Sequence, residues 1–286
     1  MEEWNQTTTG FFLMGLFPPT KTSLLLFLLV IVIFLIAFLG NSTMIFLIWM
    51  DRHLHTPMYF LLSQLSLMDL TYICSTVPKM AINFLSGNNS ISLVGCAFQS
   101  ICFLTTAGVE ALLLASMAYD RYVAICRPLH YPILMNKRMC LLMTVGSWVS
   151  ASINSIFHTV YALQYALLQY TVFFSTSLFL LIPFIGIMTS YGRVLYAVYH
   201  MRSTQGRKKA FTTCSTHLTV VTFYYGPFVY TYLRPPSLRS PEEDKNMAVS
   251  YTILTPMLNP IIYSLRNKEV LGALQRVFGK SLSQKA

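Results

Sequence analysis

The stretch SMAYDRYVAICRPLHYP, residues 116–132, joins the end of a long apolar run to a charged pair, Asp120 and Arg121, and then to a basic segment with prolines. Such a charge pair is typical of a helix that leaves the hydrocarbon core of a membrane. There the Arg side chain can reach the lipid headgroups, and the neighbouring carboxylate partly neutralises it. The stretch therefore predicts that a membrane-spanning helix ends here.

The composition extends this prediction to the whole chain of 286 residues. Of these, 55% are hydrophobic and 10% are charged, whereas soluble domains have about 25% charged residues. Apolar runs long enough to cross a hydrocarbon core of about 30 Å recur throughout, and the alternating pattern of barrel strands is absent. Because a spanning segment must satisfy its own backbone in lipid, we expect helices. The fold class is an all-α membrane protein, a seven-transmembrane helix bundle, with spans at Ser23–Met50, Met58–Met80, Leu93–Ala118, Cys140–Tyr161, Tyr170–Ala197, Phe211–Leu233 and Met247–Leu265.

The distribution of Lys and Arg predicts the orientation. With the amino terminus outside, 15 of the 20 basic residues fall in cytoplasmic segments, as the positive-inside rule requires. We expect one domain, 1–286, with an extracellular tail (1–22), a helix bundle (23–265) and a cytoplasmic tail (266–286). The net charge of +10 then reflects membrane orientation and not nucleic-acid binding.

Two further sequence features agree with this orientation. Asn5 begins an N-glycosylation sequon on the extracellular side. Lys268 to Phe278 carries apolar residues along one face of a helix, which predicts a short cytoplasmic amphipathic helix on the inner membrane surface.

Two carboxylic acids, Asp69 and Glu110, lie inside predicted spans, where burial of a charge is costly and indicates function. Counted at about 1.5 Å per residue, they lie at a similar depth. Two neighbouring carboxylates cannot both stay ionised without a counter-charge, so the pair would share a proton or hold a small cation such as sodium. The alternative is a single protonated carboxyl group hydrogen-bonded to a neighbour such as Asn41 or Asn259.

Asn259-Pro260-Ile261-Ile262-Tyr263 in the last span predicts a hinge, because Pro260 removes a backbone hydrogen bond beside a polar side chain. Together with Asp120-Arg121-Tyr122 it forms a specific pair of motifs. At these residues the sequence resembles the rhodopsin-like G-protein-coupled receptors and, within them, the olfactory receptors. The narrower resemblance rests on further motifs along nearly the whole chain: Pro57-Met58-Tyr59-Phe60-Leu61-Leu62, Met117 to Cys126, Ser190-Tyr191, Lys209 to Leu218 and Pro256 to Asn267.

The resemblance implies an odorant receptor of the plasma membrane that binds small volatile molecules and activates a heterotrimeric stimulatory G protein, which raises cyclic AMP. It implies that release of Arg121 lets the inner ends of the third and sixth spans separate. The other residues of this activation switch would be Asp120, Tyr122, Tyr191, Asn259, Pro260 and Tyr263.

The ligand site is expected in the outer half of the bundle. Its candidate residues are apolar or aromatic with a few hydroxyl groups, which suits a small volatile ligand, although aromatic residues in membrane helices also serve packing. They are Ser100, Phe103, Leu104, Ala107 and Gly108 on the third span, Ser175, Phe179, Tyr225, Phe228, Val229 and Tyr232 on the fifth and sixth, and Tyr251 and Thr252 on the seventh.

The chain departs from the family at the second extracellular loop. Olfactory receptors have a long loop there, with a cysteine that bonds to a cysteine at the outer end of the third span, which is Cys96 in this sequence. Here only eight residues separate Tyr161 from Tyr170, and none is a cysteine. We therefore expect Cys96 to lack an intrachain partner, and the chain to fold poorly, to be retained in the endoplasmic reticulum or to signal weakly.

Three other functions are alternatives to a working receptor. A receptor-derived chain that does not signal would follow from the missing loop. A cation-coupled transporter would use the same two carboxylates, but the repeated halves of such proteins are not visible. An enzyme is not expected, because nucleophile and metalloprotease motifs are absent, and no resident cofactor is expected apart from the sodium ion considered above.

Overall fold

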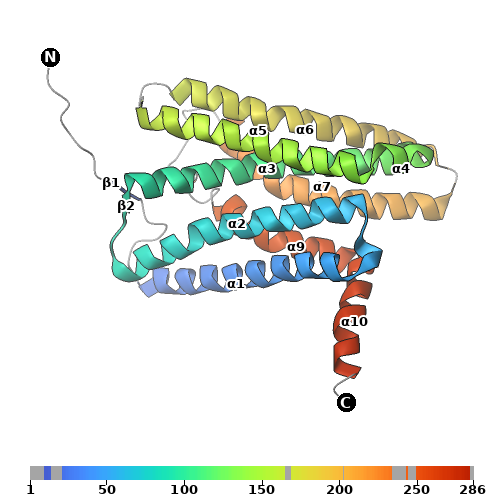
Figure 1. Cartoon of the computed structure of the whole chain (residues 1–286), viewed down its shortest axis with the longest axis horizontal. Helices are drawn as coiled ribbons and strands as arrows, with labels where there is room; N and C mark the ends of the chain where they lie inside the picture. Colours follow the sequence, from blue (N-terminus) through green and yellow to red (C-terminus); the bar gives the residue numbers. More distant parts are fainter. Residues whose placement is uncertain are drawn as a thin grey trace.

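The computed structural model describes residues 10–13, 21–164, 169–201, 203–233, 243 and 249–283. Within these residues, seven long helical segments run in alternating directions and form one bundle (Figure 1). They are α1 (Lys21–Met50), α2 (Pro57–Ser86), α3 (Leu93–Cys126), α5 (Lys137–Gln164), α6 (Gln169–Tyr199), α7 (Thr204–Leu233), and a last segment in which a π-helix (Ser250–Leu254) leads into α9 (Thr255–Arg266). The predicted helix bundle is confirmed.

Local sequence signals fix the ends of these helices. Pro57 occupies the first turn of α2, where its missing N–H group costs nothing. Gly87 ends the same helix in the left-handed region, with φ of 67°, which a residue without Cβ adopts without strain. The Ser92 side chain accepts a hydrogen bond from the Gly95 N–H group and caps α3. Helices α2 and α3 extend beyond the apolar runs from which they were predicted, because backbone caps rather than hydropathy end them.

Five of the described helices are long and apolar enough to cross a membrane, by length and composition alone. These are the segments Ser23–Met50, Pro57–Ser86, Leu93–Cys126, Lys137–Val160 and Phe179–Tyr199. Helix α7 packs along the same bundle, but its first turns contain Gln205, Arg207 and Lys208, which lower its hydropathy. Helix α9 is shorter, with 12 residues, and follows the π-helix.

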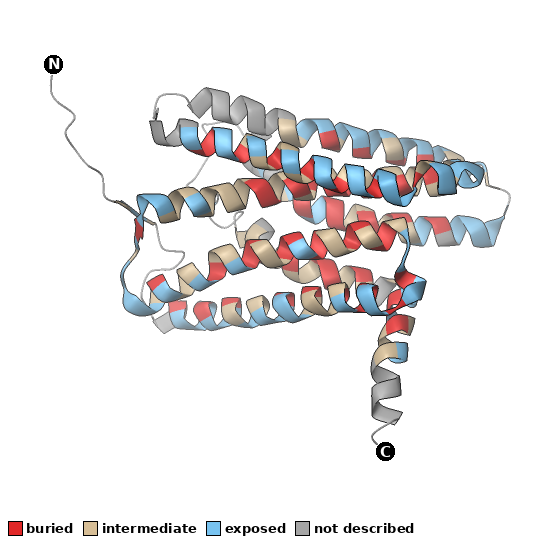
Figure 2. Cartoon of the chain, in the orientation of Figure 1, coloured by how far each residue is buried: buried red, intermediate tan, exposed pale blue. Residues whose placement is uncertain are grey.

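The core lies around α3, which packs against α2, α5 and α6. Val109, Leu113 and Met117 on this helix are completely buried. In contrast, α1 exposes a long series of leucine side chains, including Leu25, Leu28 and Leu39. Figure 2 shows buried residues on the inward faces of the helices and exposed residues on the outer faces. So large an apolar outer surface is expected for helices in contact with lipid.

The end of the bundle opposite β1 carries short helices and the amphipathic helix. They are η1 (Arg52–Leu54), η2 (Pro128–His130), α4 (Tyr131–Leu134) and α10 (Lys268–Ser283). Helix α10 runs across the bundle direction (Figure 1) and buries Val270 and Ala273. The predicted helix is therefore present, and it extends beyond Phe278.

A small two-stranded sheet at the other end was not predicted. Strand β1 (Gly10–Phe12) pairs antiparallel with β2 (Ser90–Ser92), with Phe11 opposite Ile91. A Cβ atom at Gly10 would lie 2.6 Å from the Ile91 carbonyl oxygen, so the close approach requires glycine. The sheet joins the amino-terminal segment to the connection between α2 and α3. The predicted glycosylation site, Asn5, lies outside the described residues.

Candidate functional site

The Asp120 carboxylate is the centre of a polar cluster at the inner end of α3. It is completely buried, and it forms an ion pair with Arg121, whose Nε donates a hydrogen bond to Oδ2 over 2.9 Å. Its second oxygen accepts a hydrogen bond of 2.7 Å from the Tyr131 hydroxyl on α4. Burial and the negative charge of Asp120 raise the pKa of Tyr131, so this phenol stays protonated and donates. Asp120 thus connects Arg121 to the second inner loop.

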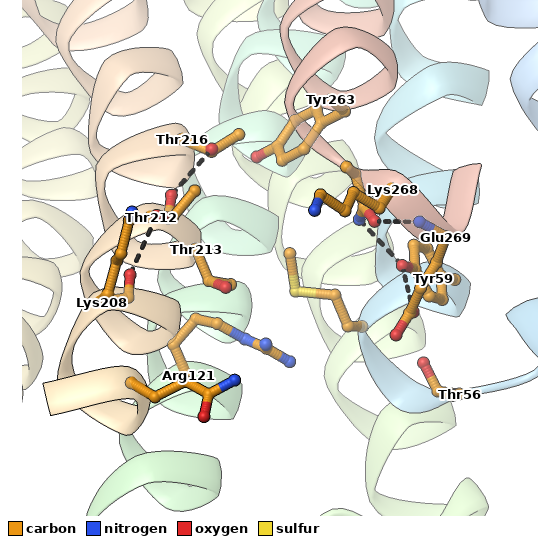
Figure 3. A pocket seen from close by; sticks show the side chains of 13 residues that line it. Thr56, Tyr59, Arg121, Lys208, Thr212, Thr213, Thr216, Tyr263, Lys268 and Glu269 are labelled. Atoms are coloured by element: carbon orange, nitrogen blue, oxygen red, sulfur yellow. Dashed lines mark hydrogen bonds between the residues drawn. The ribbon is translucent and has the colours of Figure 1, made fainter. Parts of the chain in front are cut away.

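Arg121 also borders a cavity of about 630 Å³, which we call the inner crevice. The crevice lies between α2, α3, α7, α9 and α10, and Figure 3 shows the Arg121 side chain extending toward its open space. Its rim is polar and basic, so it can receive a polar peptide segment at the inner side of the bundle. The lining residues are Thr56, Met58, Tyr59, Arg121, Gln205, Lys208, Thr212, Thr213, Thr216, Tyr263, Asn267, Lys268 and Glu269.

Tyr191 on α6 contacts α7 through His217. The hydroxyl of Tyr191 lies 2.6 Å from Nδ1 of His217, and the two rings stack with centroids 5.7 Å apart. Both side chains are buried. His217 therefore has a hydrogen-bonding role between α6 and α7.

The predicted switch residues on the last span lie at two depths of the bundle, Asn259 and Pro260 farther from the inner crevice and Tyr263 at it. Asn259 Nδ2 donates to Asp69 Oδ2 over 3.0 Å, and so connects α9 to α2. Pro260 packs against α1 so closely that a Cβ atom at Gly40 would lie 2.9 Å from its ring. Tyr263 lines the inner crevice, and its buried hydroxyl has no hydrogen-bond partner among the described residues. It is thus available for a contact in a second arrangement of the bundle.

Tyr122 lies apart from these residues. Its ring faces α6, where the Arg193 guanidinium lies 6.0 Å from the ring centroid. It lines a groove with Cys126 and Arg193, whereas Arg121 lines the inner crevice. The structure therefore does not bring Tyr122 together with Asp120 and Arg121, because successive residues of a helix point to different sides.

The structure brings Asp69 and Glu110 together near the middle of the bundle. The Glu110 carboxyl group is close enough to interact electrostatically with Asp69 and with the Asn259 side chain, and Asn259 donates a hydrogen bond to Asp69. Glu110 Oε1 and Asn259 Oδ1 are buried without hydrogen-bond partners among the described residues. Two carboxylates and an amide oxygen fit a small hard cation, whose charge would stabilise the ionised carboxylates. Asn41 instead donates to the carbonyl oxygens of Ala37 and Pro256, so Asn259 is the partner of Asp69.

The outer part of α3 carries several residues of the predicted ligand site. Ser100 lies 3.2 Å, oxygen to oxygen, from Thr159 on α5. The Phe103 ring contacts the Tyr72 ring of α2, with centroids 5.4 Å apart. The Ala107 carbonyl accepts a hydrogen bond of 2.7 Å from the Tyr224 hydroxyl of α7. These contacts hold α3 to three neighbouring helices.

Gly108 serves helix packing. A Cβ atom there would lie 3.0 Å from Ala151 on α5 and 3.3 Å from the Phe179 ring on α6. The room that the absent side chain leaves is therefore filled by neighbouring helices and not by open space. Leu104, one turn outward, is half-buried.

Tyr225 on α7 is the predicted ligand residue with the most distinctive environment. Its hydroxyl is buried without a hydrogen-bond partner among the described residues, and it interacts electrostatically with Glu110. Its ring contacts Phe184 at 5.0 Å. Val229 is exposed, and Thr252 is half-buried. The side chains of Ser175, Phe228, Tyr232 and Tyr251 lie outside the described part.

Cys96 has a free thiol, as the sequence predicted. All six cysteines of the chain lie within the described residues, and all six are free. Helix α5 ends at Gln164 and α6 begins at Gln169, so the connection between them is the segment 165–168.

Sequence reasoning missed a hydrogen-bonded group beside the inner crevice. The Tyr59 hydroxyl donates to Glu269 Oε2 over 2.6 Å and accepts from Asn267 Nδ2 over 2.8 Å. These residues connect the start of α2 to the start of α10. Tyr59 and Asn267 stand within the quoted motifs, but their pairing depends on contacts between residues 208 positions apart.

Comparison with known proteins agrees with this arrangement. Residues 40–263 match the family described as 7 transmembrane receptor (rhodopsin family). The chain is 62% identical to olfactory receptor 2L3 of Homo sapiens over 311 aligned positions, which cover 100% of both chains. It is 63% identical to olfactory receptor 2L13 of Homo sapiens over 305 positions, which cover 98% of each, and 49% identical to olfactory receptor 2M5 of Homo sapiens over 303 positions, which cover 96% of this chain and 97% of that one.

The alignment with olfactory receptor 2L3 has 311 positions and this chain has 286 residues, so about 25 positions of the alignment hold no residue of this chain. Apart from this difference, the likeness covers the whole chain, which includes the helix bundle and both motifs, Asp120-Arg121-Tyr122 and Asn259 to Tyr263. The chain is therefore a multi-pass membrane receptor and not an enzyme, and it belongs to the olfactory receptors of the rhodopsin-like G-protein-coupled receptor family.

Proposed function

We propose that this chain binds small, largely apolar volatile molecules in the outer half of the bundle and activates a stimulatory G protein at the inner crevice, which raises cyclic AMP. The plasma membrane is the proposed site of action, with the amino terminus outside. The observation that carries the proposal is the position of Arg121, which is paired with the buried Asp120 and at the same time borders the inner crevice. A residue that can exchange one partner for another suits a bundle with two arrangements.

The ligand would contact Tyr225, whose buried hydroxyl supplies one polar group in apolar surroundings. Phe184 and Phe179 are close to this part of the bundle. A pocket of this kind binds a small molecule with one hydrogen-bonding group better than a fully apolar one, because an unpaired buried hydroxyl is costly.

A receptor-derived chain that does not signal is the second candidate. It is favoured by the free Cys96 thiol and by the four residues, 165–168, that connect α5 to α6. A disulfide at this place contributes about 2–4 kcal/mol, and its loss would lead to retention in the endoplasmic reticulum.

A cyclic AMP reporter screen with a panel of volatile compounds separates the two candidates. An amino-terminal tag measures surface receptor on intact cells, so that each response is expressed per surface molecule. A working receptor gives a dose-dependent rise for at least one compound. Retention of the tagged chain inside the cell, or surface expression without a response to any compound, would favour the second candidate.

Tyr225→Phe tests the proposed ligand contact. Loss of one hydrogen bond of about 0.5–1.5 kcal/mol weakens the response to a polar odorant several-fold, with little effect on a hydrocarbon odorant. Tyr230→Phe, on the exposed side of α7, is the matched control. Equal responses of Tyr225→Phe and the unmodified chain to every polar odorant would contradict this contact.

A further inference from the structure

A second groove lies on the outer surface of the bundle near its inner end. It has a volume of about 330 Å³ and is lined by Tyr122 and Cys126 of α3 and by Gly192, Arg193, Tyr196 and Ala197 of α6. We call it the lipid groove. Neither the inner crevice nor the proposed odorant site includes its residues.

The lipid groove opens toward the bilayer and not toward the bundle interior. On α6, exposed apolar residues follow one another at helical spacing through Ile185, Met188 and Tyr196. Gly192 lies in the same row, and a Cβ atom there would have nothing within 4 Å. Because this row is the lipid-facing side of α6, an acyl chain can lie along it and occupy the space above Gly192.

Arg193 places a positive charge in this apolar surface. It stands six residues before the end of α6, which is about 9 Å along the helix axis. Its guanidinium lies over the Tyr122 ring. Among the residues that the structure describes, no carboxylate lies within ion-pair distance of it. A lipid-facing arginine without a protein counter-charge is costly unless the bilayer supplies an anion.

Contacts between the two helices fix the floor of the groove. The Cys126 thiol donates to the Arg193 carbonyl oxygen over 3.7 Å, and the buried Val194 follows Arg193 in the α6 core face. The groove therefore combines a guanidinium, two tyrosine side chains and the exposed apolar row of α6. A phosphate with an attached acyl chain matches the guanidinium and the apolar row, because arginine binds phosphate through two parallel N–H donors and the acyl chain is apolar.

We propose that the lipid groove binds an anionic phospholipid of the inner leaflet. The headgroup phosphate pairs with Arg193, and one acyl chain lies over Gly192 toward Met188. Inner leaflets carry the anionic lipids, which places the ligand on the same side as the groove. The inference requires neither odorant binding nor G-protein activation.

The experiment uses the purified full chain in vesicles of phosphatidylcholine with a minor fraction of phosphatidylserine. Spin-labelled phosphatidylserine and spin-labelled phosphatidylcholine report how strongly each lipid is immobilised by the protein. We expect a preference for phosphatidylserine that Arg193→Gln lowers about fivefold, the effect of removing one cation near an anionic membrane surface. Arg193→Lys retains part of the preference, because it keeps the charge and loses the paired donors.

Two further variants separate a built site from general attraction. Gly192→Leu fills the space within the apolar row and leaves the charge, and it should lower the preference as well. Arg138→Gln removes an exposed inner basic residue at the start of α5 and should leave the preference unchanged. Inorganic phosphate should not displace the labelled lipid, because it lacks the acyl chain.

Three results would overturn the proposal. The first is an equal loss of preference in Arg138→Gln and Arg193→Gln, which indicates diffuse attraction. The second is displacement by inorganic phosphate, which indicates a simple anion site. The third is unchanged lipid preference in Arg193→Gln together with weaker binding of purified G protein, which makes Arg193 a protein contact. Thermal unfolding of each variant verifies that the chain is folded in every comparison.

Discussion

The Tyr191 hydroxyl on α6 lies 2.6 Å from His217 Nδ1 on α7, and both side chains are buried. This hydrogen bond connects two helices at the level of the inner crevice, where the sixth span would move during activation. Tyr263 faces the same region with a hydroxyl that has no hydrogen-bond partner among the described residues. Among the described residues, the Tyr191 hydroxyl therefore has His217 as its hydrogen-bond partner in this arrangement.

Tyr191→Phe should destabilise this arrangement. The substitution leaves His217 Nδ1 buried without its hydrogen-bond partner, which costs about 1–3 kcal/mol. We expect a lower midpoint temperature of unfolding for the purified receptor. Tryptophan fluorescence or the fluorescence of a bound dye follows the unfolding. Tyr199→Phe, which alters an exposed tyrosine of the same helix, should change nothing. Equal midpoints for Tyr191→Phe and Tyr199→Phe would mean that the hydrogen bond has no energetic role.

Glu110→Gln should remove a dependence of stability on sodium. If Asp69, Glu110 and Asn259 hold a sodium ion, binding stabilises the folded chain by RT ln(1 + [Na⁺]/Kd), about 0.4 kcal/mol at half saturation and more above it. The unmodified chain should then unfold at a higher temperature in sodium chloride than in choline chloride. A midpoint that depends on pH but not on sodium would instead assign a shared proton to the pair.

The ionisation of Asp51, which pairs with Arg276 of α10, should make the docking of α10 depend on pH. Burial alone would raise the pKa of Asp51, but hydrogen bonds from Arg276 and His53 outweigh it and lower the pKa from 3.8 to about 2. Because the folded-state pKa is lowered, the contact stabilises the docked α10 above pH 3.8 and is lost as the pH falls toward 2. Asp51→Asn should release α10 at neutral pH as well.

A fluorophore at Gln275, an exposed position of α10, measures this release. The change in stability should be about 1 kcal/mol or less, because Arg276 is 43% exposed and exposed ion pairs are weak. Arg138→Gln serves as the control for a general change of charge. A fluorophore signal that is the same in Asp51→Asn and in the unmodified chain at neutral pH would show that other contacts hold α10.

Cys96→Ser should leave the amount of surface receptor unchanged, because the thiol has no disulfide partner. Replacing residues 165–168 by a longer connection that carries a cysteine should raise surface expression and make Cys96 necessary for it. The expected gain corresponds to a cross-link of about 2–4 kcal/mol. Loss of surface receptor on Cys96→Ser in the original chain would contradict the assignment of Cys96 as unpaired.

The sequence predicts the helices well because a helix in contact with lipid needs a long run of apolar residues. Ser23–Met50 is apolar throughout and forms α1 over almost the same residues. The last span is less well predicted: the helix interior contains a π-helix at Ser250–Leu254, which hydropathy does not indicate. The pairing of β1 with β2 joins residues about 80 positions apart, and its backbone hydrogen bonds leave no periodic signal in the sequence.

The candidate site, too, is predicted only in part from the sequence. Charge in an apolar span identifies Asp69, Glu110 and Arg121, because burial makes such residues costly. The partners of these residues are not visible in the sequence. These contacts depend on how the helices pack. They are the hydrogen bond from Tyr131 to Asp120, the position of Arg193 over the Tyr122 ring, and the Phe179 ring beside Gly108. In the sequence, Gly108 suggests open space beside α3. In the structure, the Phe179 ring of α6 occupies that space.

Arg121 is proposed to transmit ligand binding at the outer half of the bundle to the inner crevice. The direct measurement is the cyclic AMP response per surface receptor of Arg121→Gln to an odorant that activates the unmodified chain, with Arg138→Gln as the control. Loss of a charge-assisted contact of about 1.5–3 kcal/mol should lower the response of Arg121→Gln about tenfold or more, while Arg138→Gln responds normally. An undiminished response of Arg121→Gln at equal surface expression would contradict the account.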